Sequence, residues 1–257
     1  MGRGCQIGTR KNKIKGISFV MGDFSQNGII SNLHDFGTKT TADIEKELVK
    51  FSKERKMELI LPSLYSELKG DALPNIVKQI SETKYLNHII VGLDKASKAE
   101  AVKAWKFFKK LNTPFTILWN DGPRLKKLHE ELKKKDLAPS EMGKGRNVWY
   151  CLGMCIARDE ARSVALHDCD IKTYDRRMLA KLFYPVVNPF FNFEFCKGYY
   201  PRIANGKMNG RVARLLVFPL LTALEKTIGK SDYLEFMKSF KYPLAGEFSF
   251  RRNVLPE

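Results

Sequence analysis

The sequence lacks any apolar run long enough to cross a bilayer. Its longest, residues 215–224, contains Pro219 and is about half the roughly 20 residues that a spanning helix needs. The N-terminal region lacks the long apolar core of a secretory signal peptide. The five cysteines are odd in number, and Cys151 and Cys155 have no second pair that would complete a zinc site. We therefore expect a soluble, cytoplasmic protein with reduced thiols and no membrane partner.

Acidic residues are few relative to basic ones. The 45 Lys and Arg against 28 Asp and Glu give a formal net charge of +17. Nucleic-acid binding is one explanation for such a balance. In residues 124–132, however, the charges surround a stripe formed by Leu125, Leu128 and Leu132, which predicts a solvated helix face. No aromatic residues lie among those lysines to stack bases, so we expect small anionic substrates rather than nucleic acid.

Short apolar strands alternate with amphipathic helices through the first two thirds of the chain. The pattern predicts strands at 57–61, 88–93, 115–119 and 163–167, with helices at 41–54, 73–80, 98–111, 123–135 and 147–158. Such alternation is typical of an α/β protein with a mostly parallel central sheet and helices on both faces. Ligands bind such sheets at the carboxyl ends of the strands. The polar residues that follow the strands are therefore the candidates: 62–67, Asp94, 120–121 and 168–170.

After residue 170 the pattern changes. We expect helices at 176–183, 211–227 and 232–240, and an aromatic-rich strand or hairpin at 190–200. The chain divides into three parts: a basic N-terminal tail and lead-in (1–40), an α/β half that binds the nucleotide (41–170), and a second half (171–257) that packs on the sheet and forms the other wall of a cleft.

The pair Asp168 and Asp170, separated by Cys169, is the sharpest chemical feature. Two carboxylates at a strand end can hold a divalent cation that bridges diphosphate oxygens. A bare Asp-x-Asp match is more often two exposed turn residues. Its position after a buried strand favours the metal site here. Cys169 lies between carboxylates that raise the pKa of its thiol, so it is not expected to act as a nucleophile.

Two basic segments precede helices. The loop 143–146 contains Lys144 and Arg146, and the segment 209–211 ends in Arg211. Backbone donors at a helix start, together with these cations, suit phosphate or carboxylate groups, although flexible basic loops have the same composition. His167 is isolated from any Ser or Cys partner, and such a histidine is usually structural.

Taken in order, these motifs resemble the glucosyl-3-phosphoglycerate synthases. The matching segments run from about Met57 to about Arg252 and read 61–67 (LPSLYSE), 72–77 (ALPNIV), 91–94 (VGLD), 143–145 (GKG), 168–170 (DCD) and 210–212 (GRV). The resemblance implies the GT-A nucleotide-sugar transferase fold.

The resemblance also implies the site residues. Those that bind the donor nucleotide sugar would be Pro62, Ser63, Leu64, Glu67, Asp94, Lys144, Asp168 and Cys169. Asp170 would be the direct ligand of Mg²⁺ or Mn²⁺, and Asp168, Asp170 and Arg211 would be catalytic. The acceptor would contact Gly210, Arg211, Val212, Ala213 and Phe248. The family has a threonine where Ala213 stands and a tyrosine where Phe248 stands.

The implied reaction transfers glucose from UDP-glucose, or from another NDP-hexose, to the 2-hydroxyl of 3-phosphoglycerate with retention, in glucosylglycerate (compatible-solute) biosynthesis. The family is commonly homodimeric. Its members continue beyond the point matching Glu257 with a metal-binding histidine, so the resemblance predicts a C-terminally shortened chain with weak donor binding and little turnover. Two alternatives remain open: a sugar-nucleotide nucleotidyltransferase, although the glycine-rich loop typical of that class is absent, and a basic nucleic-acid-binding protein, whose affinity would fall steeply with salt.

Overall fold

The computed structural model describes residues 30–33, 37–200, 203–204, 207–208 and 211–255. Residues 1–29 and 34–36 of the N-terminal tail and lead-in, and residues 209–210 before Arg211, lie outside the described residues. The helices are α1 (Thr41–Phe51), α2 (Ala72–Ser81), α3 (Lys98–Phe108), α4 (Pro123–Lys133), α5 (Lys144–Arg158), α6 (Arg176–Val187), α7 (Phe218–Ile228) and α8 (Asp232–Ser239), with short helical segments η1 (Tyr65–Lys69), η2 (Ala213–Val217) and η3 (Arg252–Val254). The strands are β1 (Met57–Leu64), β2 (Leu86–Asp94), β3 (Phe115–Trp119), β4 (Ser163–Leu166), β5 (Phe195–Lys197), β6 (Ile203–Ala204), β7 (Lys207–Met208) and β8 (Phe248–Arg251).

Six strands form one sheet in the order β3-β2-β1-β4-β8-β5, and β6 and β7 form a separate small pair. Strands β1 to β4 are parallel to one another, while β8 runs antiparallel to both of its neighbours, β4 and β5. The predicted α/β class with a mostly parallel central sheet is confirmed. The alternation of strands with helices explains it, because each parallel neighbour requires a crossover connection.

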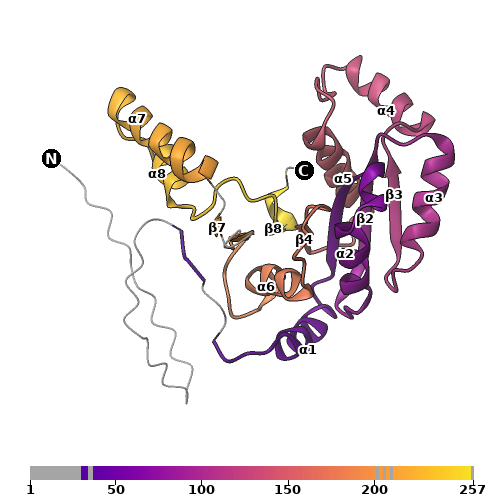
Figure 1. Cartoon of the computed structure of the whole chain (residues 1–257), viewed down its shortest axis with the longest axis horizontal. Helices are drawn as coiled ribbons and strands as arrows, with labels where there is room; N and C mark the ends of the chain where they lie inside the picture. Colours follow the sequence, from indigo (N-terminus) through magenta and orange to yellow (C-terminus); the bar gives the residue numbers. More distant parts are fainter. Residues whose placement is uncertain (1–29, 34–36, 201–202, 205–206, 209–210, 256–257) are drawn as a thin grey trace.

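Helices cover both faces of the sheet, as the sequence predicts (Figure 1). Successive strand residues point to opposite faces, and in β1 the two neighbours Leu59 and Ile60 accordingly enter different clusters. Leu59 packs with α1, α2 and α6, whereas Ile60 packs with Cys151 and Cys155 of α5. Burial on both faces accounts for the nearly continuous apolar sequence of these strands.

Most helices and strands begin and end close to the residues that capping and strand-ending patterns in the sequence predict. Thr40 caps α1, since its hydroxyl accepts from the Asp43 amide at 3.2 Å while the Asp43 carboxylate accepts from the Thr40 amide at 3.0 Å. The predicted strand at 57–61 is too short, because β1 continues through Pro62 to Leu64. The pairing of β1 with β4 ends at Ile60, and residues 61–64 pair with β2 alone. Pro62 therefore lies where one side of the strand no longer needs an amide donor.

The second half of the chain differs most from expectation. Strand β8 was not predicted, yet it lies inside the sheet between β4 and β5. Helices α7 and α8 contact each other and extend away from the sheet, rather than packing on it (Figure 1). The second half therefore contributes to the sheet through β5 and β8. The division into ligand-binding halves stays a prediction.

Candidate functional site

The carboxyl ends of β1, β2 and β4 lie side by side, because these strands are parallel neighbours in the sheet. The polar residues predicted to matter follow these three ends: Ser63 and Glu67 at β1, Asp94 at β2, and Asp168 just beyond β4. One edge of the sheet thus brings together side chains that are more than 100 positions apart in the sequence.

Asp168 forms an ion pair with Lys144, at the start of α5. The prediction that 143–146 is a loop before the helix is wrong by three residues: Gly143 is the N-cap, and Lys144 is the first helical residue. Gly143 has a φ of 150°, a conformation that favours glycine. On its other side, Asp168 abuts the backbone of Gly246, where a Cβ would collide with the carboxylate. The Asp168 side chain is 22% exposed, so one part of it remains open to solvent.

Glu67 is held at the end of β1 by two hydrogen bonds. One of its oxygens, Oε2, accepts from Ser63 Oγ at 2.9 Å and from the Leu64 amide at 3.0 Å. Burial raises the pKa of Glu67, and the nearby carboxylates of Asp170 and Asp168 add to the rise, while these hydrogen bonds oppose it. Glu67 therefore lies within electrostatic reach of both aspartates.

Asp94 ends β2 in a buried network of amides. Its Oδ1 accepts from Asn120 Nδ2 at 2.8 Å, and its Oδ2 accepts from Asn147 Nδ2 at 2.9 Å. The same Asn147 nitrogen donates to the Gly92 carbonyl at 2.9 Å. Sequence reasoning named Asp94 and noted Asn120 but missed Asn147, since an Asn inside an apolar helix gives no distinctive signal.

Cys169 and Asp170, which follow Asp168, differ in their exposure to solvent. Asp170 is exposed, while Cys169 is 2% exposed. The expected direction for Cys169 is confirmed: its thiol pKa is raised well above the usual value, mainly by burial, with Glu67 and the two aspartates adding to it. Within the described ranges, no group of three or more His, Cys, Asp or Glu lies together as a ready-made metal cluster.

The second half of the chain brings Lys197 and Glu247 close to Asp168. Burial lowers the pKa of Lys197, and the positive charge of Lys144 lowers it further. The carboxylates of Glu247 and Asp168 raise it. The ammonium group of Lys197 donates to the Ala245 carbonyl. Sequence reasoning missed both residues. Glu247 follows Gly246, and the backbone of Gly246 approaches the Asp168 carboxylate closely in the fold. The sequence alone does not show this approach.

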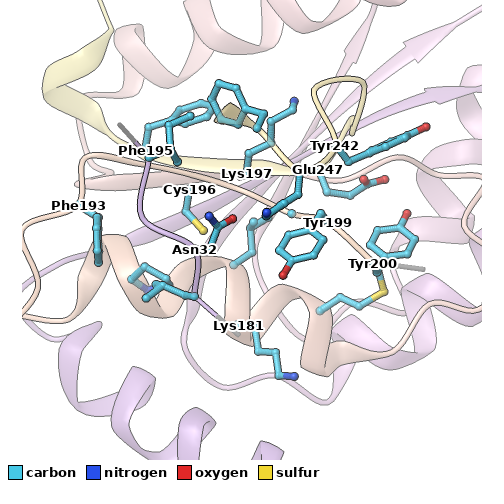
Figure 2. Close-up of a pocket in the computed structure, with 18 of the residues that line it drawn as sticks. Asn32, Lys181, Phe193, Phe195, Cys196, Lys197, Tyr199, Tyr200, Tyr242 and Glu247 are labelled. Carbon is cyan, nitrogen blue, oxygen red and sulfur yellow. The ribbon is translucent and has the colours of Figure 1, made fainter. Parts of the chain in front are cut away.

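A cavity of about 800 Å³ adjoins this edge, between α6, β5 and α8 (Figure 2). Phenylalanine and tyrosine side chains form part of its wall, and Tyr199, Tyr200 and Tyr242 gather around Glu247 (Figure 2). Lys181 and Lys197 add positive charge to the wall. Lys197 and Glu247 thus belong both to the cavity wall and to the carboxylate edge, the sheet edge that carries Glu67, Asp94 and Asp168.

The predicted acceptor residues do not lie together as the predicted donor residues do. Arg211 and Val212 are exposed and Ala213 is buried. Among the described residues, no hydrogen bond or ion pair joins Arg211 to the carboxylate edge. Phe248 lies in β8, stacked between Phe195 at 5.8 Å and Phe250 at 6.0 Å between ring centroids.

His167 is fully buried, and neither ring nitrogen has a hydrogen-bond partner among the residues that the structure describes. Its ring packs edge-on against Tyr174 at 5.4 Å between centroids. Burial lowers the pKa of His167 to about 3, so the ring is neutral at physiological pH. These features fit the structural role expected of it. None of the described helices is long and apolar enough to cross a membrane.

Solved structures define the class of fold. The chain is similar to glucosyl-3-phosphoglycerate synthase from Mycobacterium tuberculosis in complex with Mn²⁺, UDP and glucosyl-3-phosphoglycerate, with a TM-score of 0.57 and 20% identity over 87% of this chain and 64% of that one. The complex of the same enzyme with Mn²⁺ and UDP-glucose also gives a TM-score of 0.57 at 20% identity, covering 86% and 63%. The protein therefore has the GT-A fold of nucleotide-sugar transferases.

Curated proteins with similar sequences provide a second comparison. The chain is 43% identical over 234 residues to glucosyl-3-phosphoglycerate synthase of Persephonella marina and 38% identical over 235 residues to that of Methanococcoides burtonii. These alignments cover 91% and 90% of this chain but 58% and 57% of the relatives. No family model matches the chain. The chain is thus homologous to the glucosyl-3-phosphoglycerate synthases, as its motifs indicated, and spans somewhat more than half of their length.

Proposed function

We propose that this chain carries the donor site of a retaining, metal-dependent glycosyltransferase that moves glucose from UDP-glucose to 3-phosphoglycerate. The observation that supports the proposal most strongly is the carboxyl edge of the sheet. There Asp168 pairs with Lys144, at the same edge as Glu67 and Asp94, within a GT-A fold and a sequence homologous to such synthases.

On the donor side, the buried carboxylate of Asp94 and the Ser63–Glu67 pair would bind the uridine part. Both lie at the ends of adjacent strands, in the crevice where parallel sheets bind nucleotides. Lys144 would bind the diphosphate, because it is a half-exposed cation at a helix N-terminus, where backbone amides also favour anions.

The donor set fits a divalent cation with oxygen ligands. Asp170 is exposed at the edge, whereas one oxygen of Asp168 is engaged by Lys144. Asp170 would therefore be the direct ligand, with diphosphate oxygens and water completing the shell. When bound, Mg²⁺ or Mn²⁺ would neutralise charge on the leaving diphosphate. The solved complexes of the M. tuberculosis enzyme with Mn²⁺ and UDP support this choice.

For the acceptor, Arg211 remains the predicted anchor of the phosphate or carboxylate, and the adjoining cavity with Lys181 and Lys197 offers a positively charged wall. A structure of the M. tuberculosis enzyme with phosphoglyceric acid supports the acceptor class. Retention would follow from front-face attack assisted by the leaving diphosphate. A cytoplasmic homodimer is the expected form.

A panel of donors tests the proposal. The purified chain is incubated with UDP-glucose, UDP-galactose, GDP-glucose or GDP-mannose, with and without 3-phosphoglycerate and Mn²⁺, and glycosylated acceptor is measured by mass spectrometry. Product from UDP-glucose and from none of the other three donors, even at low yield, supports the proposal if it forms only when both 3-phosphoglycerate and Mn²⁺ are present. Product from a GDP-sugar, or hydrolysis indifferent to 3-phosphoglycerate, contradicts it.

A further inference from the structure

The carboxylate of Asp94 is fixed by donors on both of its oxygens. Asn120 donates to Oδ1 and Asn147 donates to Oδ2, at 2.8 and 2.9 Å. All three side chains are at least 92% buried, since they are 8%, 6% and 2% exposed for Asp94, Asn120 and Asn147. A buried carboxylate held by two amides cannot rotate without breaking both of these hydrogen bonds.

Asn147 is itself held in place from two directions. Its amide nitrogen also donates to the Gly92 carbonyl at 2.9 Å, and its Oδ1 accepts weakly from the Cys151 thiol at 3.5 Å. A Cβ on Gly92 would lie 1.7 Å from Asn147 Oδ1, so only glycine admits the amide at this place on β2. The close approach of α5 to β2 therefore serves to bring one amide against Asp94.

We propose that Asn147, supported by Asn120, is the positioning residue that sets the base specificity of the donor site. It presents Asp94 as a pure hydrogen-bond acceptor to the nucleobase. The inference rests on the proposed function, in which Asp94 faces the uridine part of the donor. Each carboxylate oxygen has about two lone-pair sites. With one site filled by an amide, the others are left to accept a base N–H.

The chemistry of the bases gives the specificity. Uracil carries a donor at N3–H, which an oriented carboxylate accepts. Cytosine carries only a lone pair at N3, which the same carboxylate repels. A buried polar site rejects a ligand that leaves its groups unpaired far more strongly than an apolar pocket rejects a missing methylene. The site therefore selects UDP over CDP, and the selection depends on the Asn147 amide.

Asn147→Asp tests the role with almost no change of shape. The substitution replaces the donating amide by an accepting oxygen, so at pH 8 a second carboxylate faces Asp94 and the Gly92 carbonyl. We expect UDP binding, measured by calorimetry with Mn²⁺, to weaken relative to the unaltered protein by about tenfold or more. Near pH 5 the two paired carboxyl groups share a proton, which donates a hydrogen bond in place of the amide. The loss of UDP affinity relative to the unaltered protein should therefore shrink severalfold.

The readout is the ratio of variant to unaltered affinity at each pH, because UDP itself titrates in this range. The titratable groups facing the pair are the two carboxyls and the Cys151 thiol, whose pKa is raised by burial beyond this pH range. Asn75→Asp is the matched control. Asn75 donates to the Tyr174 carbonyl at 3.0 Å, so it undergoes the same chemical change outside the site. Its affinity ratio should stay near one at both pH values.

Asn120→Asp, at the other carboxylate oxygen, gives an independent variant if Asn147→Asp does not fold by far-UV circular dichroism. An affinity ratio near one at pH 8 in a folded variant, or a deficit equal at pH 5 and pH 8, overturns the inference while UDP binding by the unaltered protein leaves the proposed function standing. Equal binding of UDP and CDP by the unaltered protein also overturns it. Absence of any nucleotide binding overturns the proposed function itself.

Discussion

Gly92→Ala should destabilise the protein strongly, although it adds a single methyl group. The new Cβ would lie 1.7 Å from Asn147 Oδ1 and 2.7 Å from Cys151 Sγ. Neither neighbour is the far end of a flexible side chain, because Asn147 is tied to Gly92 and Asp94 and both residues lie on α5. Helix α5 must therefore shift away from β2, or the Asn147 side chain must turn.

The magnitude follows from what is lost. Forced overpacking costs about 1–3 kcal/mol, and two buried hydrogen bonds of Asn147 contribute about 1 kcal/mol each. Against this, replacing glycine in a strand restricts the unfolded chain and returns roughly 0.5–1 kcal/mol. We expect the free energy of unfolding to fall by about 2–4 kcal/mol on balance.

Urea denaturation followed by circular dichroism measures the change. Gly153→Ala is the matched control. Gly153 is exposed on α5, the helix that carries Asn147, and a Cβ there would meet no atom of the described residues within 4 Å. That variant should gain about 0.5–1 kcal/mol from helix propensity. If Gly92→Ala unfolds at the same urea concentration as the unaltered protein, the tight contact between β2 and α5 is not required and the reasoning fails.

Three further predictions follow from the site and its surroundings. Asp170→Ala should abolish metal-dependent binding of UDP-glucose in calorimetry while the circular dichroism spectrum is unchanged; unaltered affinity would remove Asp170 from the metal site. Arg211→Ala should weaken 3-phosphoglycerate binding by about 1.5–3 kcal/mol, the value of a hydrogen bond to a charged group, and should spare UDP-glucose; equal loss for both ligands would refute the assignment. His167 has a folded pKa of about 3, so below its unfolded pKa of about 6.5 only the unfolded chain binds the proton. Its contribution to stability is therefore lost as the pH falls, by about 2 kcal/mol between pH 7 and pH 5, and His167→Phe should remove that part of the pH dependence in urea titrations; a variant with the slope of the unaltered protein would show that His167 is not the group responsible.

Local patterns determined the first part of the fold well. The strands before residue 167 and the helices between them could be predicted because continuous apolar runs and capping residues such as Thr40 are local signals. Strand β8 could not, since Phe248–Arg251 alternates phenylalanine with polar residues and contains no continuous apolar run. Lys144 was assigned to a loop because Gly143 and Gly145 mark a turn as readily as a helix start.

The site divides in the same way. Asp168 and Asp94 were predictable because the carboxyl edge of a parallel sheet gathers whatever polar residues follow its strands. Asn147 was not, since its significance comes from Asp94, 53 positions away, and from the missing side chain at Gly92. Lys197 and Glu247 reach the site through β5 and the segment before β8, so their role depends on sheet pairing that short patterns do not encode.

Calorimetric titration of the purified chain with UDP-glucose, with Mn²⁺ and then with EDTA, tests the central claim most directly. We predict binding that requires the metal, that UDP competes away and that GDP does not. The failure of UDP-glucose to bind in the presence of Mn²⁺, or binding of equal strength in EDTA, would contradict a metal-assisted UDP-glucose site at the carboxyl edge of this sheet.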